Sequence, residues 1–492
     1  MACVLAIDQG TTNSKALLVD ERGAIVASAS APVGVSYPRP GWVEQSPEAI
    51  WQSVVQVAGE SAARAEGRPI AAIGISNQRE SVLLWDRRSG EPIGPCVTWQ
   101  CRRSADRIAA LRTPAFEAEV QRLTGLGLDP LFPAAKLGWL LDALPEARGR
   151  AVAGELCAGT VDAWLVYRLT GGARHVTDFS NASRTQLFDI GAGEWSAGLA
   201  EAFAVPIGIL PHPLASDAEF GATAGVPGLP DGIPIRAVMG DSHAALYGHG
   251  ARGPGLVKAT YGTGSSLMTL LDRRAAGDSR LSTTIAWRLG ERTVFALEGN
   301  ITVSAQAAAW AATMLGLADA AALTELAATV PASDGVVFVP ALAGLGAPHW
   351  VSDARAMFCG MTLATRPAHL ARATLEAIAL QVNDVFAAMQ AAVGRPLEAL
   401  SVDGGATRND LLMQIQADVV GRPVRRTAVA ELSAAGVAVL AGARAGLWAD
   451  DGPAALREIR DAMAPRLPAD ARAALLAQWQ VALSRAVLSA GA

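Results

Sequence analysis

The first twenty residues contain two short apolar runs separated by a polar turn. Residues 4–8 (VLAID) and 15–20 (KALLVD) are the apolar runs, and Gly, Thr, Asn and Ser crowd between them. Short apolar runs bounded by turn residues predict two β-strands joined by a tight turn. Residues 21–30 predict a third strand. A helix should then begin at Pro47, with Ser46 as its N-cap.

The same apolar–polar–apolar pattern returns in the middle of the chain. Residues 256–271 (LVKATYGTGSSLMTLL) again place a turn rich in Gly and Thr between two apolar runs. After each hairpin, runs typical of buried strands alternate with segments of helical periodicity. The segments that carry this prediction are residues 71–76, 155–171, 234–250, 295–300, 335–344, 397–421 and 433–446.

Alternating strands and helices, with a repeated opening hairpin, predict an α/β protein of two domains with mixed sheets and a cleft between them. The transition between the two halves falls in GHGARGPG, residues 248–255. We therefore expect an N-terminal domain over residues 1–250 and a C-terminal domain over residues 251–492. The last segment, about residues 452–492, is predicted as helices flanking the second domain.

The composition excludes several classes of protein. The 492 residues are 51% hydrophobic and 18% charged, which excludes disorder driven by charge. A net charge of -5 gives no electrostatic reason for a nucleic-acid or anionic-membrane partner. We find no apolar run of membrane-spanning length and no secretion signal. The five cysteines form no CxxC pair or metal-binding spacing, so we expect a cytoplasmic protein with free thiols.

The two Gly/Thr-rich turns have the chemistry of phosphate-binding loops. Such turns present backbone N–H groups and hydroxyls with little side-chain bulk, which suits a phosphate chain. Asp8, at the end of the first strand, can hold Mg²⁺ through water molecules. A third Gly-rich turn in residues 402–410 (VDGGATRND) allows close approach to a flat base. Either of the first two turns alone is better explained as an ordinary hairpin turn, and the third is equally consistent with a plain strand-to-helix turn. Two similar hairpins heading two repeats nevertheless favour nucleotide binding.

The three turns, in this order, resemble the ribonuclease-H-like fold shared by sugar kinases, Hsp70 and actin. Longer stretches resemble the FGGY carbohydrate kinases, and within them the glycerol-kinase-like branch. The stretches that carry this resemblance are GWVEQSPEAIW (41–51), IGISNQRE (73–80), TWQCRRS (98–104), GTVDAWLVYRLT (159–170), HVTDFSNASRTQLFDI (175–190), GLGAPHW (344–350) and RATLEAIALQ (372–381).

The resemblance implies ATP- and Mg²⁺-dependent phosphorylation of a hydroxyl on a small polyol or sugar. Asp241 corresponds to the catalytic base of the family and Asp8 to its metal-site residue. Arg79, Glu80 and Trp99 match the positions of the polyol pocket. The positions that match the nucleotide site are Thr11, Thr12, Asn13, Lys15, Thr263, Gly264, Ala305, Ala309, Gly405 and Asn409, of which Ala305 and Ala309 stand where the family often has Gly and Gln.

Three positions depart from glycerol kinases. Leu131, Ser242 and Ser266 stand where that pattern has Tyr, Gln and Phe, and His243 follows Ser242. Losing groups that hydrogen-bond substrate hydroxyls should weaken glycerol binding. Replacing a Phe by Ser opens space for a longer substrate, such as a four- or five-carbon polyol or ketose. His243 either contacts the additional hydroxyls or only caps its helix, and the sequence favours neither.

Alternative interpretations stay open at this point. Asp241 also suits the N-cap of the helix that follows it. Arg79 and Glu80 are compatible with a solvated edge or an ion pair, and Trp99 with a core position. A glycerol kinase with a variant pocket and a non-catalytic nucleotide sensor on the same fold are the rival functions. A homodimer is common in the family and is the oligomer that the resemblance implies.

Overall fold

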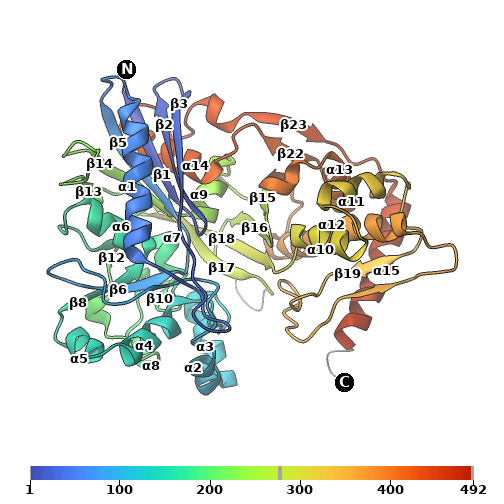
Figure 1. Ribbon diagram of the computed structural model, residues 1–492, viewed down its shortest axis with the longest axis horizontal. Helices are drawn as coiled ribbons and strands as arrows, with labels where there is room; N and C mark the ends of the chain where they lie inside the picture. The colour runs from blue at the N-terminus through green and yellow to red at the C-terminus, as the bar shows by residue number, and fades with distance from the viewer. Residues whose placement is uncertain (1, 275–279, 489–492) are drawn as a thin grey trace. The chain divides into compact units, whose positions relative to one another are not determined.

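The computed structural model describes residues 2–274 and 280–488 (Figure 1). Internal contacts divide the chain into two compact units. Unit 1 comprises Met1–Gly250, Thr283–Ala296 and Glu431–Arg457, and unit 2 comprises Ala251–Ser282, Leu297–Ala430 and Glu458–Ala492. Two segments from the second half of the chain therefore belong to the first unit.

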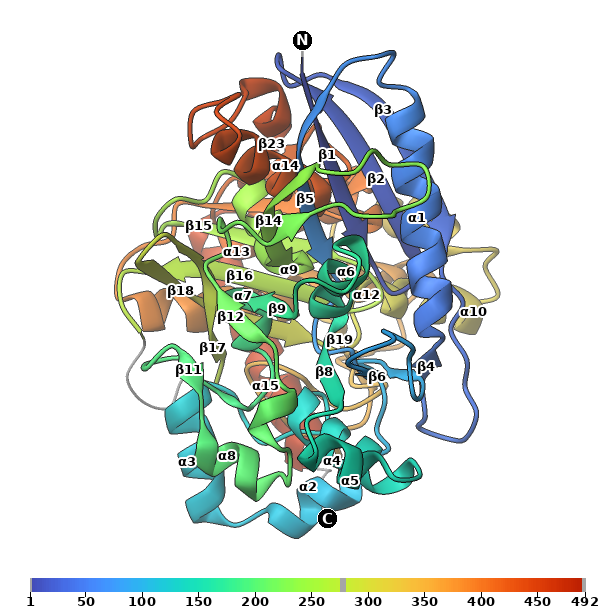
Figure 2. The same ribbon diagram turned by 90° about the vertical axis from the view of Figure 1, so that its left-hand side faces the viewer.

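A six-stranded sheet with the order β13-β14-β5-β1-β2-β3 forms the centre of unit 1 (Figure 2). β1 is antiparallel to β2, and it is parallel to β5, which is in turn parallel to β14. The carboxyl ends of β1, β5 and β14 therefore meet at one edge of the sheet. These strands are β1 (Cys3–Gln9), β2 (Asn13–Asp20), β3 (Ile25–Pro32), β5 (Ile70–Asn77), β13 (Gly221–Ala222) and β14 (Pro234–Gly240).

Helices cover both faces of this sheet. On one face, α1 (Pro47–Ala63) packs on β1, β2 and β3, and Ile73 and Ile75 of β5 point into the same apolar core. On the other face, α14 (Leu432–Arg444) packs on β1, β5 and β14 and on helix α9 (Asp241–Gly248). Gly74 makes this second contact possible, because a Cβ there would lie 2.5 Å from the carbonyl oxygen of Val437.

A second, smaller layer of unit 1 is formed by segments between β5 and β14 in the sequence, together with the short strand β4, which precedes β5. Its four-stranded sheet has the order β4-β7-β6-β8 and a separate apolar core. The sequence does not predict this sheet, because two of its strands contain only two residues. Its elements are β4 (Glu44–Gln45), β6 (Val82–Asp86), β7 (Cys96–Val97), α2 (Ala105–Leu111), α3 (Pro114–Thr124), α4 (Pro133–Ala143), α5 (Ala147–Val152), β8 (Leu156–Thr160) and α6 (Val161–Leu169).

The remaining elements of unit 1 are short connections around the two sheets. They include residues 175–190 (HVTDFSNASRTQLFDI). They are β9 (Val176–Asp178), α7 (Phe179–Ala182), β10 (Phe188–Asp189), β11 (Glu194–Trp195), α8 (Ala197–Ala202), η1 (Ile207–Ile209), β12 (His212–Leu214) and η3 (Ala454–Arg457). The longer strands β17 (Ser282–Leu289) and β18 (Arg292–Ile301) lie at one end of a separate seven-stranded sheet.

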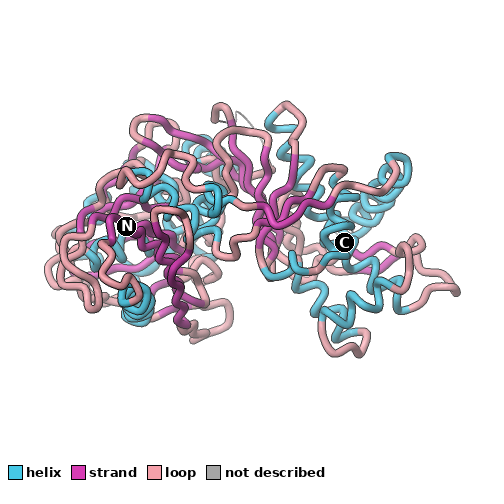
Figure 3. The backbone as a smooth tube through the Cα atoms, turned by 90° about the horizontal axis from the view of Figure 1, so that it is seen from above, coloured by secondary structure: helices cyan, strands magenta, loops and turns pink. Residues whose placement is uncertain are grey.

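Unit 2 also combines helices with strands (Figure 3), and its central strands repeat the hairpin and the parallel pairing of unit 1. β15 is antiparallel to β16 and parallel to β21, which is parallel to β22. This pairing matches that of β1 with β2 and of β1, β5 and β14. The strands are β15 (Leu256–Tyr261), β16 (Ser265–Leu271), β19 (Val337–Val339), β20 (Met357–Cys359), β21 (Ala399–Asp403), β22 (Val424–Thr427) and β23 (Ile459–Met463); the helices are α10 (Ala305–Met314), α11 (Ala320–Ala328), α12 (Pro367–Val393), η2 (Gly405–Arg408), α13 (Asp410–Val420) and α15 (Ala469–Leu488).

Most predicted elements are confirmed. The opening strands, the second hairpin and the strand-to-helix passages all form, and Ser46 caps α1 by accepting a hydrogen bond from the N–H of Ala49 at 3.2 Å. The prediction of helices alone after residue 452 is wrong. β23 lies in that segment and pairs antiparallel with β22. Partner strands far along the chain select this extended conformation, so local patterning does not reveal it.

Replacing Gly74 by Ala should destabilise unit 1. The added methyl group would overlap the backbone of α14, which must shift, and we expect a loss of about 1–3 kcal/mol in the free energy of unfolding. Urea unfolding followed by circular dichroism measures it. Gly149→Ala is the control, because nothing lies within 4 Å of its Cβ position on α5, and it should leave stability unchanged or raise it by up to about 1 kcal/mol.

Candidate active site

The pairing of β1, β5 and β14 brings charged side chains from distant parts of the sequence to one edge. Gln9 lies opposite Asn77, and Asn77 lies opposite Gly240, at the ends of the three strands. Polar residues placed at or just beyond the carboxyl ends of parallel strands therefore face the same region. The predicted site residues at this edge are Asp8, Arg79, Glu80 and Asp241.

Asp8 is held in a setting that disfavours its charge. The pKa of Asp8 is raised to about 6, chiefly because the carboxyl is buried. The hydrogen bond from Ser76 Oγ at 2.8 Å lowers this pKa, and the nearby Asp241 carboxylate raises it. Lys15 also lowers the pKa of Asp8, but its Nζ forms an ion pair with Glu431 at 2.6 Å. The arrangement leaves two carboxylates near one another and opposes full ionisation of both.

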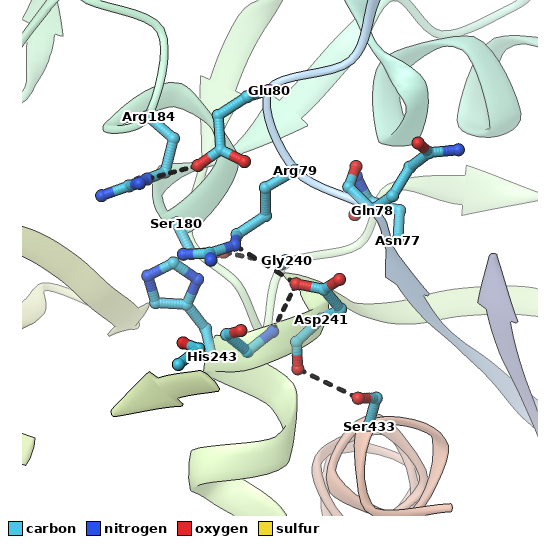
Figure 4. A network of polar contacts seen from close by, with 12 residues as sticks. Asn77, Gln78, Arg79, Glu80, Ser180, Arg184, Gly240, Asp241, His243 and Ser433 are labelled. Carbon is cyan, nitrogen blue, oxygen red and sulfur yellow. Dashed lines mark hydrogen bonds and ion pairs between the residues drawn. The ribbon is translucent and has the colours of Figure 1, made fainter. Parts of the chain in front are cut away.

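Arg79 and Asp241 form an ion pair at the start of α9 (Figure 4). Arg79 Nε lies 3.2 Å from Asp241 Oδ1, and the same oxygen accepts a hydrogen bond from the N–H of Ser242 at 2.6 Å. The Arg79 stem crosses Gly240, where a Cβ would lie 2.6 Å from its Cγ. Gly240 is the N-cap, so Asp241 is instead the first residue of the helix, where the dipole stabilises its negative charge.

Glu80 forms a second, buried ion pair. Arg184 Nε donates to Glu80 Oε1 at 2.6 Å, and both side chains are almost completely buried (Figure 4). The interpretation of Arg79 and Glu80 as a solvated edge is therefore wrong. Burying charges is expensive unless each is paired, so this network is built at a cost in stability.

Trp99 connects the predicted polyol pocket with the first phosphate turn. Its indole Nε1 donates to Thr11 Oγ1 at 2.9 Å, and its backbone N–H donates to Ser81 Oγ at 3.1 Å. Its side chain is 37% exposed, so it is not a core residue. Leu131 is half-buried, and its N–H donates to Asp129 Oδ1 at 2.8 Å. The backbone around both apolar side chains is thus fixed by hydrogen bonds.

His243 lies one residue beyond the half-buried Ser242 and is fully buried. Its imidazole lies beside the Arg79 guanidinium in Figure 4, and its Nε2 is 3.4 Å from Thr284 Oγ1. Thr284 in turn shares a hydrogen bond of 2.8 Å with Ser183. His243 therefore packs against Arg79 and close to the N-cap Gly240, where a Cβ would lie 3.1 Å from His243 Nδ1.

The second phosphate turn belongs to unit 2 and packs on its own helix. The Thr263 carbonyl accepts a hydrogen bond from the N–H of Ser304 at 2.9 Å, just before α10. At Gly264 a Cβ would lie 2.4 Å from the carbonyl oxygen of Ile301, so only glycine fits. Thr263 is exposed. Ser266 is half-buried, and its hydroxyl donates to Glu298 at 3.3 Å.

The predicted adenine-side residues of unit 2 lie on three neighbouring segments. Gly405 follows β21 and has open space at its Cβ position, where the nearest atom, Arg408 Nη2, lies 3.9 Å away. Asn409 caps α13 by accepting from the N–H of Leu412, and it donates to Thr324 Oγ1 at 2.8 Å. Ala305 begins α10, and Ala309 is exposed one turn later.

Models of known families match most of the chain. Residues 3–248 match the N-terminal domain of the FGGY family of carbohydrate kinases, and residues 257–445 match its C-terminal domain. The chain belongs to the FGGY family of carbohydrate kinases. It is an ATP-dependent sugar or polyol kinase, as its relatives are.

Two curated relatives of this FGGY kinase carry different names. An apulose kinase of Pectobacterium atrosepticum is 48% identical over 99% of this chain and 98% of its own length. A glycerol kinase of Alkalilimnicola ehrlichii is 46% identical over 99% and 98%. Both relatives are named as kinases, which confirms the kinase activity, whereas the substrates in their names differ.

Solved structures show the same fold. Plasmodium falciparum glycerol kinase with ADP superposes with a TM-score of 0.94 at 30% identity, over 99% of this chain and 98% of that one. A xylulose kinase from Rhodospirillum rubrum gives 0.89 at 27% identity over the full length of both. The two-domain α/β fold of sugar kinases is thereby confirmed. No helix in the described part of the FGGY chain is long and apolar enough to cross a bilayer.

The structure distributes the predicted site residues over both units of the kinase. Asp8, the first turn and the predicted acceptor residues other than Ser266 belong to unit 1, while Ser266 and the second and third turns belong to unit 2. Supporting residues on the SNQRE and DFSNASR stretches are not among those predicted from the sequence. These are Gln78, whose amide bonds Gln9 and Gln45, Ser180, which accepts from the N–H of Gly240, and Arg184. Polar residues inside otherwise apolar stretches are the signal that indicates them.

Asp8→Asn should stabilise the FGGY kinase in a pH-dependent way. Because the folded-state pKa is raised to about 6, the folded state holds more protons than the unfolded state between about pH 4 and pH 6. The free energy of unfolding of the wild type therefore falls across this window. The variant should gain up to about 3 kcal/mol above pH 6 and almost nothing near pH 4.

Urea unfolding of both proteins from pH 4 to pH 8 measures this difference. Asp353→Asn, at an exposed carboxylate, is the control and should show no such pH-dependent gain. A constant difference between wild type and Asp8→Asn across the whole range would contradict the prediction.

Proposed function

We propose that this FGGY kinase transfers the γ-phosphoryl group of ATP to a hydroxyl of a four- or five-carbon ketose or polyol. The observation that carries the proposal is the first turn of α9, where Asp241 pairs with Arg79 and is followed by the short Ser242. A small hydroxyl in place of a long amide leaves room for an acceptor longer than glycerol. The similarity to a relative named apulose kinase supports a ketose.

Asp241 acts as the general base of the reaction. The acceptor hydroxyl oxygen forms a bond to the γ-phosphorus of ATP, the bond from that phosphorus to the bridging oxygen breaks, and ADP leaves. The hydroxyl proton passes to the Asp241 carboxylate as charge develops on the oxygen. Arg79 pairs with this carboxylate and, together with the N-terminus of α9, fixes its direction.

The other predicted residues bind the two substrates. Arg79 and Glu80 bond vicinal hydroxyls of the acceptor, and Trp99 and Leu131 form its apolar wall. Ser242, His243 and Ser266 complete the acceptor side. The nucleotide side comprises Thr11, Thr12, Asn13 and Lys15 on the first turn, Thr263 and Gly264 on the second, and Ala305, Ala309, Gly405 and Asn409 around the base.

Asp8 holds Mg²⁺ through water in this proposal. The Asp8 carboxylate fits a hydrated cation, because a divalent charge offsets both the burial of this group and its repulsion by Asp241, which raise its pKa. No group of three or more metal-binding side chains occurs among the described residues, which suits an ion that keeps much of its water shell. Bound Mg²⁺ neutralises charge on the transferring phosphates.

Domain roles, oligomeric state and location complete the proposal. We assign the acceptor, phosphate and metal roles chiefly to residues 1–250 and the nucleotide role to residues 251–492. A cytoplasmic location and a homodimer follow from the cysteine pattern and from the family. A glycerol kinase with a variant pocket is the second candidate, supported by the relative of that name.

Asp241→Asn should abolish turnover while preserving nucleotide binding. Loss of a general base lowers kcat by roughly 10²–10⁴-fold, because the amide does not accept the hydroxyl proton. Steady-state ADP release measures kcat, and calorimetry with Mg²⁺–ATP measures binding. Unchanged turnover would contradict the role of Asp241 as the general base.

The acceptor is identified by kcat/KM over a panel. We expect erythrulose, ribulose, xylulose, apulose or a polyol among erythritol, threitol, ribitol and xylitol to exceed glycerol. Leu131→Tyr with Ser242→Gln restores side chains typical of glycerol kinases and should shift the preference toward glycerol by about tenfold or more. If glycerol is already the best acceptor of the wild type, the second candidate replaces the first.

A further inference from the structure

Lys136 lies on α4 with its whole side chain buried behind the predicted acceptor residues. Its Nζ donates to the carbonyl oxygen of Leu131 at 2.5 Å and to that of Glu80 at 3.1 Å. One ammonium group thus joins two loops that are separated by some fifty residues. Neither bond involves an acceptor-binding side chain directly, since both use backbone oxygens.

Glu80 needs this support because its backbone is strained. Its φ of 61° lies in the left-handed region, which a residue with a side chain rarely adopts. Such conformations persist only where surrounding contacts over-determine them, and they gather at functional sites. Arg184 fixes the Glu80 carboxylate, and Lys136 fixes the Glu80 carbonyl. The two cations therefore hold the residue at both ends.

The same lysine fixes the loop that carries Leu131. Asp129 accepts from the N–H of Leu131, and Lys136 binds the carbonyl of the same residue. Ala134, in the first turn of α4, donates its N–H to the carbonyl oxygen of Thr185, next to Arg184. α4 therefore carries Lys136 and is also bonded to the segment that holds Arg184, so it connects the two residues that bind Glu80.

Burying the Lys136 amine lowers the stability of the fold, because a charged amine loses its hydration there. Burial lowers the pKa of Lys136 to about 7, although Glu80, Cys101, Cys96 and Asp129 face it and raise that pKa. An apolar side chain of similar length would fill the same space without desolvating a charge. The amine is therefore better explained by the two carbonyls that it holds than by packing.

We propose that Lys136 is a positioning residue that sets the distance between Glu80 and Leu131 and thereby tunes acceptor affinity. The inference rests on the proposed function, in which Glu80 and Leu131 contact the acceptor. Lys136 itself touches no substrate. Its removal should loosen the acceptor pocket and leave the nucleotide residues of unit 2 unchanged.

Lys136→Met removes both hydrogen bonds and keeps the length of the side chain. We expect the KM for the acceptor to rise by roughly 10–100-fold, because small misplacements of binding groups weaken productive binding. The KM for ATP should change less than about twofold. Thermal unfolding of the same sample reports whether the variant is folded, and Lys136→Gln replaces it in the same assay if it is not.

The control is Lys258→Met, at another of the three lysines of the sequence. Lys258 is equally buried but lies on β15 of unit 2, so the acceptor KM should not change. A rise of both KM values together with a lower Tm in Lys136→Met would show a merely structural role and would overturn the inference. An unchanged acceptor KM would overturn it as well.

Glu80→Gln separates this inference from the proposed function. If Glu80→Gln raises the acceptor KM and Lys136→Met does not, only the role of Lys136 is wrong. If neither substitution changes the acceptor KM, Glu80 does not bind the acceptor and the proposed pocket itself fails. A rise in both variants with an unchanged KM for ATP supports the two together.

Discussion

The parallel pairing of β1, β5 and β14 is the constraint on which the active-site residues of unit 1 depend. Backbone hydrogen bonds fix the register, so Gln9, Asn77 and Gly240 lie in one row. The charged residues near the ends of these strands then converge, although they are separated by up to 233 positions in the sequence, from Asp8 to Asp241. Backbone hydrogen bonds therefore set the positions of these residues, and their side chains provide the charged groups.

This convergence has an electrostatic cost that the surrounding residues offset. Two carboxylates near each other raise the pKa of one, and buried ions require partners. Arg79 and Arg184 supply these partners for Asp241 and Glu80. The same cations hold the carboxylates in fixed directions, which matters in phosphoryl transfer because the protein contributes mainly positioning and charge stabilisation. The buried charges lower the stability of the fold, and their ion pairs hold the carboxylates in fixed positions.

Most of the residues that we propose for catalysis and for acceptor binding come from two parts of unit 1. Asp8 and Asp241 lie on or beside the central sheet, which the helices α1 and α14 cover from both faces. Trp99, Leu131 and Lys136 belong to the inserted layer between β5 and β14, where loops and short strands dominate. In the proposed function, a change in that layer alters one part of the acceptor pocket without disturbing the sheet, while Ser242 contributes another part from the start of α9. The two relatives of nearly equal identity carry different substrate names.

The sequence by itself determined the alternating elements, the repeated hairpin, the glycine turns and the family, because these are local patterns or long matching stretches. It also placed Asp8 and Asp241 at strand ends. Only the tertiary structure decided that Glu431–Arg457 joins the first unit, that β23 is a strand, and that Arg184 and Lys136 hold Glu80. Each of these depends on contacts between residues far apart along the chain, and burial and pairing arise only when the chain is folded.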